Sequence, residues 1–216
     1  MKIFAVWTAL SKTKSEDAAQ RKRALSAAEV GQLLNDFDGH GGNFQTIKAF
    51  QLMWLTLSRP NESVQAEWVE FDLDKALWTI PARRMKARRE HVVPLPTQAV
   101  ELLKAMHPIT GHTKFVFPNR DDRQRPMADA ALRQALKKLG WATKYSPHGT
   151  RTTGSTRLNE MGYRPDAIEA QLAHAEPNSV RRTYNHATYL DERRVMMQDW
   201  ADKLDGWKTH ARKDAN

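Results

Sequence analysis

The fold class is decided by residues 68–95, which read WVEFDLDKALWTIPARRMKARREHVVPL. Apolar and polar residues alternate over residues 68–72, and two further short apolar runs follow at residues 77–80 and 91–95. Alternation with a period of two is typical of half-buried strands, and the turn residues after the first run favour an antiparallel neighbour. The stretch therefore predicts three short antiparallel strands with a basic loop between the second and the third.

Helical periodicity surrounds this small sheet on both sides. Upstream, Ser26 and Glu29 form a capping-box pattern that opens a helix, which ends near Gly39. An almost wholly apolar helix follows over residues 44–57 and ends before Pro60. Downstream, helical patterns occupy residues 97–106, 128–139, 150–161, 165–172, 178–184 and 190–204. The sequence predicts a mainly α (α+β) fold with a small three-stranded antiparallel sheet.

The length and composition indicate one folded domain with short flanking segments. A chain of 216 residues, of which 40% are apolar, can bury one good hydrophobic core. We expect residues 1–24 to be a linker or the remnant of a preceding domain. Residues 25–205 form the predicted domain, and residues 206–216 are predicted to be a flexible basic tail.

The charge balance indicates a polyanionic partner. There are 34 lysines and arginines against 25 acidic residues, which gives a net charge of +9 and a pI near 9.8. Such an excess favours nucleic acid, because phosphate neutralisation releases counterions. The absence of cysteine excludes disulfides, zinc–thiolate sites and thiol catalysis. No stretch is long enough to span a bilayer, and the N-terminus does not resemble a signal peptide, so we expect a cytoplasmic protein.

Several common catalytic motifs are missing from the sequence. There is no glycine-rich phosphate loop ending in lysine, no His-Glu-x-x-His motif and no Gly-x-Ser-x-Gly elbow. The acidic residues are scattered, which disfavours a metal-dependent nuclease. We therefore predict no metal and no cofactor. What remains is a dispersed set of arginines, a lysine, histidines and a tyrosine, each of which also has a structural explanation when taken alone.

Together these residues resemble one family. Arg59-Pro60-Asn61-Glu62 resembles the Arg-x-x-Glu box of tyrosine recombinases, the phage integrase family. Lys86, followed by His91 to Leu95, is similar to the hairpin lysine region of prophage-type integrases. His148-Gly149-Thr150-Arg151 matches the His-x-x-Arg box, and Leu172-Ala173-His174 with Tyr184 resembles the final box, although Ala173 replaces the commoner glycine. The order and spacing agree over residues 25–205, which implies the helical catalytic domain of this family. The resemblance also implies that the domain preceding it, of which residues 1–24 would be a linker or remnant, is a DNA-binding domain.

The resemblance implies a role for each group in DNA strand cleavage and joining. Arginines clamp the phosphate oxygens, the tyrosine is the nucleophile, a histidine is the base and the lysine is the general acid. The implied catalytic residues are Arg59, Lys86, His148, Arg151, His174 and Tyr184, with Glu62 supporting Arg59. The predicted contacts to the DNA backbone are Arg83, Arg84, Arg88, Arg89, Arg181 and Arg182.

Alternatives stay open at this point. Among the four tyrosines, Tyr189 is the serious rival of Tyr184. The terminal helix could pack on its own core or dock on a neighbouring subunit. The resemblance implies a site-specific recombinase that acts on double-stranded DNA attachment sites as a homo-tetramer, with a monomer as the alternative without DNA. The competing hypotheses are a type IB topoisomerase-like enzyme, a hairpin resolvase and a catalytically decayed DNA-binding module.

Overall fold

The computed structural model describes residues 23–174 and 189–213. Its helices are α2 (Ala27–Asp38), α3 (Phe44–Thr56), α4 (Pro60–Val64), α5 (Thr97–Thr110), α6 (Ala130–Lys138), α7 (Gly149–Glu160), α8 (Pro165–Gln171) and α10 (Leu190–Lys213). The strands are β1 (Phe71–Asp72), β2 (Leu77–Ile80) and β3 (His91–Pro94), with 3-10 turns η1 (Trp68–Glu70) and η2 (Ala82–Arg84). The predicted class, mainly helical with a three-stranded antiparallel sheet in the order β1-β2-β3, is confirmed.

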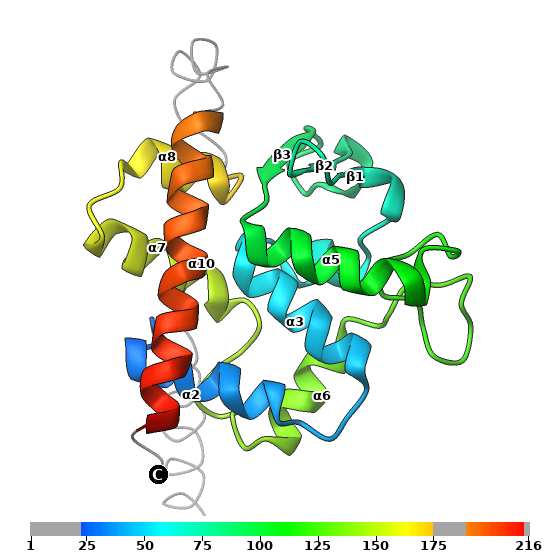
Figure 1. Ribbon diagram of the computed structural model, residues 1–216, viewed down its shortest axis with the longest axis horizontal. Coiled ribbons are helices and arrows are strands. Elements are labelled where there is room, and N and C mark those ends of the chain that lie inside the picture. Colours follow the sequence, from blue (N-terminus) through cyan, green and yellow to red (C-terminus); the bar gives the residue numbers. More distant parts are fainter. Residues whose placement is uncertain (1–22, 175–188, 214–216) are drawn as a thin grey trace, which may run out of the picture.

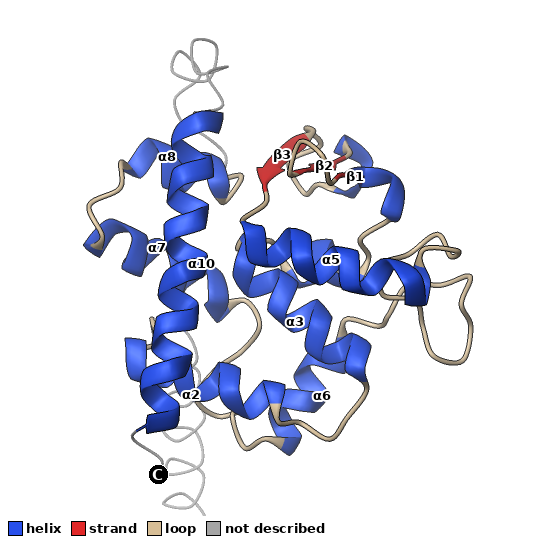
Figure 2. Ribbon diagram, in the orientation of Figure 1, coloured by secondary structure: helices blue, strands red, loops and turns tan. Residues whose placement is uncertain are grey.

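Helices surround one core, and the sheet lies at one end of the molecule (Figure 2). α3 is buried along most of its length and contacts α2, α4, α5, α6 and α10. Phe37, Phe50, Trp54 and Trp200 are fully buried, and the Trp200 indole donates to the Trp54 carbonyl at 2.7 Å. α10 therefore belongs to the same core as α3, which explains its long apolar seam.

α10 runs along one side of the molecule, from α8 at one end to α2 at the other (Figure 1). The capping box predicted for α2 is present: the Ser26 hydroxyl accepts from the Glu29 amide, and the Glu29 carboxylate accepts from the Ser26 amide. α2 and α10 approach closely at Gly31, where an added Cβ would lie 2.2 Å from the Trp207 carbonyl oxygen. The described terminal helix therefore packs on its own chain.

Two sequence predictions need correction. The strand expected over residues 68–72 consists of the 3-10 turn η1 and the two-residue strand β1. The alternation fails as a strand because Glu70 turns inward, where it accepts from the Trp78 indole and pairs with Arg84. The flexible tail predicted from residue 206 is also wrong, because α10 continues to Lys213 and buries Ala211 against the rest of the protein.

Candidate active site

Arg59 leaves the buried end of α3 and is held by Glu62. Leu57 ends α3 in a left-handed conformation with a φ of 53°, and Pro60 starts α4 immediately after Arg59. The Arg59 guanidinium donates to Glu62 Oε1 at 2.8 Å, and the Arg59 backbone amide donates to Glu62 Oε2 at 2.7 Å. Because one buried carboxylate fixes both the backbone and the side chain, the direction of Arg59 is set before any ligand binds.

A pocket of about 470 Å³ opens in front of Arg59. Five cationic side chains line it, together with a carboxylate, an amide, a thioether and an imidazole. The lining residues are Arg59, Asn61, Glu62, Arg83, Arg84, Met85, Lys86, Arg88 and His148. The structure thus brings together residues that lie up to 89 positions apart and that the sequence analysis had singled out for one site. Such a cluster of cations suits a phosphate group.

The basic loop between β2 and β3 supplies the lysine and three of the arginines. Met85 is buried and anchors the loop, whereas Lys86, Arg88 and Arg89 are exposed. Arg89 does not line the pocket. The exposed position of Lys86 leaves its ammonium group available to a ligand in the pocket.

Arg84, one of the predicted DNA contacts, is held by the protein itself. Its guanidinium pairs with the buried carboxylate of Glu70 and donates to the Glu62 carbonyl at 2.7 Å, with only 10% of the side chain exposed. A guanidinium committed in this way ties the loop to α4 and η1. Arg84 is therefore a structural residue at the base of the pocket, whereas Arg83 is 64% exposed.

α7 contributes His148 and Arg151. His148 occupies the N-cap position, but its side chain makes no capping hydrogen bond and is exposed to the pocket. Arg151, one helical turn later, is buried and donates to the Leu57 carbonyl at 2.9 Å and to the Leu172 carbonyl. Burial, and then the nearby charge of Arg59, lowers the pKa of Arg151 to about 10. It remains cationic at neutral pH.

The segment after α8 closes this region. The Ala173 carbonyl accepts from the Arg59 guanidinium at 3.3 Å, so both predicted phosphate-binding arginines donate to neighbouring carbonyls of one turn. His174 follows directly, is exposed, and places its Nδ1 atom 2.6 Å from the Glu169 carboxylate. His174 does not line the pocket. Its link to Arg59 is the preceding residue, Ala173, whose carbonyl accepts from the Arg59 guanidinium.

Tyr184, Arg181 and Arg182 lie outside the described residues. Of the other tyrosines, Tyr145 is buried and its hydroxyl hydrogen-bonds to the Thr150 hydroxyl. Desolvation raises the pKa of Tyr145 well above the ordinary value of a phenol. The Tyr163 hydroxyl donates to Asp199, and burial raises its pKa to about 12. Neither phenol suits a nucleophile.

Three residues of this region were missed by the sequence analysis. His91 on β3 donates from Nε2 to the Gln171 carbonyl at 3.1 Å, and burial followed by the charges of Arg193, Arg151 and Arg59 lowers its pKa to about 3. Gln171 and Arg193 are buried beside it. Arg193 could have been noticed in the sequence, because it is a charged residue on the apolar face of α10. It lies three residues before Met196 and seven before Trp200.

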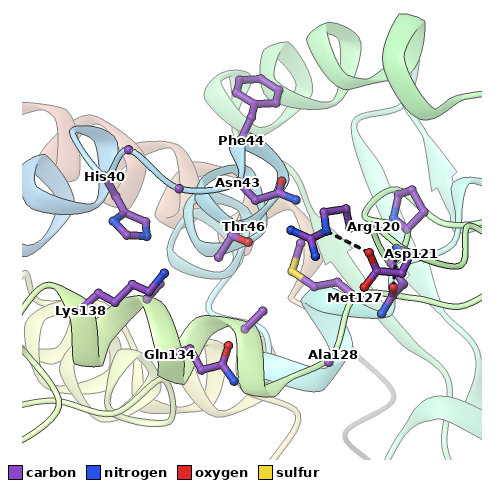
Figure 3. Close-up of a pocket in the computed structure, with 16 residues that line it drawn as sticks. His40, Asn43, Phe44, Thr46, Arg120, Asp121, Met127, Ala128, Gln134 and Lys138 are labelled. Atoms are coloured by element: carbon purple, nitrogen blue, oxygen red, sulfur yellow. Dashed lines mark hydrogen bonds and ion pairs between the residues drawn. The ribbon is translucent and has the colours of Figure 1, made fainter.

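A second pocket lies at the opposite end of α3. It has a volume of about 710 Å³ and lies between the α2–α3 loop, residues 118–128 and α6. In Figure 3, His40 and Lys138 lie on one side of it and the Arg120–Asp121 ion pair on the other. None of the predicted catalytic residues that the structure describes, namely Arg59, Lys86, His148, Arg151 and His174, lines this pocket.

Two further features bear on the class of protein. Within residues 23–174 and 189–213, no group of histidine and carboxylate side chains has the arrangement of a metal site. No helix of the described part has the length and apolar character needed to cross a bilayer.

Similar proteins cover almost the whole chain. The sequence profile described as the phage integrase family matches residues 23–190. Prophage integrase IntA of Escherichia coli (strain K12) is 40% identical over 191 residues, which are 88% of this chain and 46% of IntA. The integrase of Enterobacteria phage P4 is 40% identical over 213 residues, covering 91% of this chain and 48% of its own. The chain spans about half the length of the curated relatives it matches.

Solved structures share the fold. XerH site-specific recombinase bound to its difH substrate superposes with a TM-score of 0.59 at 20% identity, covering 80% of this chain and 53% of XerH. The integrase from mycobacterium phage Brujita gives a TM-score of 0.58 at 17% identity, covering 81% of this chain and 56% of the Brujita integrase. The profile match extends over well more than half of the residues and includes the pocket described above. This chain belongs to the phage integrase family of tyrosine recombinases.

Proposed function

We propose that the chain is the catalytic part of a site-specific DNA recombinase that cleaves and rejoins attachment sites to integrate or excise a mobile element. The observation that carries the proposal is the pocket that Arg59, Lys86 and His148 line, with Arg151 near enough to Arg59 for their charges to interact. Its cations suit a DNA phosphate, and such a substrate would be met in the cytoplasm. We place the catalytic unit at residues 25–213, because α10 continues to Lys213.

The arginines would grip the scissile phosphate. A guanidinium offers five N–H donors, and within the described residues Arg151 donates to two backbone carbonyls. The remaining donors of Arg59 and Arg151 can bind the nonbridging oxygens, whose charge grows in the transition state. Arg83 and Arg88 would hold neighbouring backbone phosphates from the rim of the pocket.

The reaction we propose needs a nucleophile, a base and an acid. The Tyr184 phenol attacks the phosphorus and passes its proton to His148, while the bond from phosphorus to the 5′ oxygen breaks. Lys86 donates a proton to that oxygen, so a 5′ hydroxyl leaves and a 3′-phosphotyrosine remains. Attack by another 5′ hydroxyl reverses these steps, and the phosphodiester energy is conserved. His174 would donate a hydrogen bond to the same phosphate.

Strand exchange between two duplexes requires four cleavages, and each protomer of this design offers one Tyr184. We therefore propose a homo-tetramer on DNA. XerH was solved with its difH substrate and the Tn1549 integrase with circular intermediate DNA, which supports a double-stranded DNA partner.

Covalent trapping tests the proposal. The chain is incubated at low ionic strength with a nicked suicide duplex carrying the attachment site, so that the cleaved fragment diffuses away. We expect a covalent protein–DNA adduct that forms in EDTA, persists in Tyr189→Phe and is lost in Tyr184→Phe. An adduct that survives Tyr184→Phe refutes the assignment of the nucleophile.

Two further outcomes separate the competing hypotheses. Relaxation of supercoiled DNA without exchange between cognate sites would indicate a topoisomerase-like enzyme. DNA binding without any adduct from the unmodified chain would indicate a catalytically decayed module.

A further inference from the structure

One turn of backbone holds both phosphate-binding arginines. In residues 171–173 three successive carbonyls point at the site: the first is 3.1 Å from His91 Nε2, the second accepts from Arg151, and the third accepts from Arg59 at 3.3 Å. The direction of each guanidinium therefore depends on where this turn lies. A shift of the turn would move both arginines together.

The side chain of Gln171 fixes the turn. Its Nε2 atom donates to the Thr56 carbonyl at the end of α3 over 2.8 Å. Its Oε1 atom accepts two hydrogen bonds from Arg193 on α10, at 3.0 Å from Nε and 2.8 Å from Nη2. Gln171 is 1% exposed and Arg193 is 2% exposed, so water does not compete for these bonds.

Arg193 also reaches the sheet. Its Nη2 atom donates to the Val92 carbonyl of β3 at 2.7 Å, next to His91. One guanidinium thus joins α10, the turn after α8 and β3. The planar, rigid fork of an arginine suits such a three-way junction, whereas the single ammonium group of lysine does not.

Arg193 occupies a position in α10 where an apolar residue is expected. Met196, Met197 and Trp200 on the same seam are fully buried apolar residues. An apolar side chain would avoid the desolvation cost that a buried guanidinium carries, and burial lowers the pKa of Arg193 to about 10. The bonds to Gln171, which set the turn, are among those that offset this cost.

We propose that Arg193 is a positioning residue, which acts through Gln171 to hold the 171–173 turn and thereby the guanidiniums of Arg59 and Arg151. The inference rests on the proposed strand-cleavage function. It also makes the seating of α10 a condition for an assembled phosphate site, because the helix that follows the Tyr184 segment supplies the clamp. Displacement by about 1 Å would cost on the order of 100-fold in cleavage rate.

The test measures single-turnover cleavage of the suicide duplex at saturating protein, alongside the DNA dissociation constant and the thermal midpoint. Arg193→Met and Gln171→Leu should each lower the cleavage rate by about 10- to 100-fold, with the dissociation constant changed less than about threefold. Arg193→Lys should recover only part of the rate. Leu204→Ala is the matched control, because it weakens the same helix eleven residues away, and it should leave the rate of the folded protein within about twofold of the unmodified chain.

The double variant decides the route. If Arg193 acts through Gln171, the variant carrying both substitutions cleaves about as fast as either single variant. Losses that multiply, or a rate in Arg193→Met no lower than in Leu204→Ala at equal folded fraction, would overturn the inference. Failure of the unmodified chain to form any adduct would instead reject the proposed function, so the two failures are distinguishable.

Discussion

Substitution of Gly31 by alanine tests whether α10 packs on α2 of its own chain. A Cβ at this position would lie 2.2 Å from the Trp207 carbonyl oxygen and 2.7 Å from the carbonyl carbon, where ordinary contacts begin at 3.4 Å. Both atoms belong to the backbone of α10, so no change of side-chain rotamer relieves the clash. The two helices must separate by about 1 Å.

The magnitude follows from two opposing effects. Overpacking of a close helix contact costs about 1–3 kcal/mol or more, and a backbone clash belongs at the upper end of that range. Alanine recovers about 1 kcal/mol in intrinsic helix propensity over glycine. We expect a net loss of about 2 kcal/mol in the free energy of unfolding, which corresponds to a fall in Tm of about 4–8 °C for a chain of this size.

Gly206→Ala is the matched control on the other helix. It makes the same chemical change within α10, but the added Cβ meets nothing within 4 Å. It should raise stability by about 1 kcal/mol. Urea and thermal unfolding of both variants measure the difference, and a rise in both would refute the contact. A fall in Gly31→Ala that depends on protein concentration would instead indicate that α10 of a second copy occupies this place.

Three further predictions follow from the site. Arg84→Ala should lower the free energy of unfolding by about 3–5 kcal/mol, because it leaves the buried Glu70 carboxylate without its cation. Arg83→Ala should lower it by less than about 1 kcal/mol. It should instead reduce the salt dependence of DNA binding by about one ion. The pKa of His91 falls from its ordinary value near 6.5 to about 3 in the folded protein, so only the unfolded chain gains this proton as the pH drops below 6.5. The free energy of unfolding should therefore decline by about 1–2 kcal/mol from pH 7 to pH 5. Urea unfolding at both pH values should show that His91→Gln lacks this part of the decline. Ala173→Gly should raise the free energy of unfolding by about 0.5–1 kcal/mol, because Ala173 has a φ of 46°, and calorimetry that shows a decrease would contradict this conformation.

The sequence predicted the elements whose signals are local. The capping box at Ser26 and the apolar run of α3 both depend on neighbours within one or two helical turns, and both elements begin within a residue of their predicted starts. The strand predicted over residues 68–72 was too long: only residues 71–72 form β1, because Glu70 turns inward to pair with Arg84, fourteen residues later. The tail after residue 205 was wrong because its helical order comes from α2, which lies far away in the sequence.

The basic loop shows the same limit within the site. Five of the seven residues 83–89 are cations, and charge alone does not distinguish between them. Only the position of Glu70 and of the Glu62 carbonyl separates the buried Arg84 from the exposed Arg83. The pattern of charges therefore predicted the basic surface, but it did not show that Arg84 ties the loop to α4 and η1.

The atoms that orient the candidate catalytic arginines explain why their geometry could not be predicted. Arg59 and Arg151 were recognisable from their motifs, but Arg151 is held by the carbonyls of Leu57 and Leu172, and Arg59 by Glu62 and a third carbonyl. Every residue has a carbonyl, so such acceptors leave no trace in the sequence. Arg193 differs, because a charged residue at an apolar position of a helix must find buried partners or pay for its desolvation. The side chains that arrange a site of this kind are therefore best sought among charges that interrupt an apolar seam.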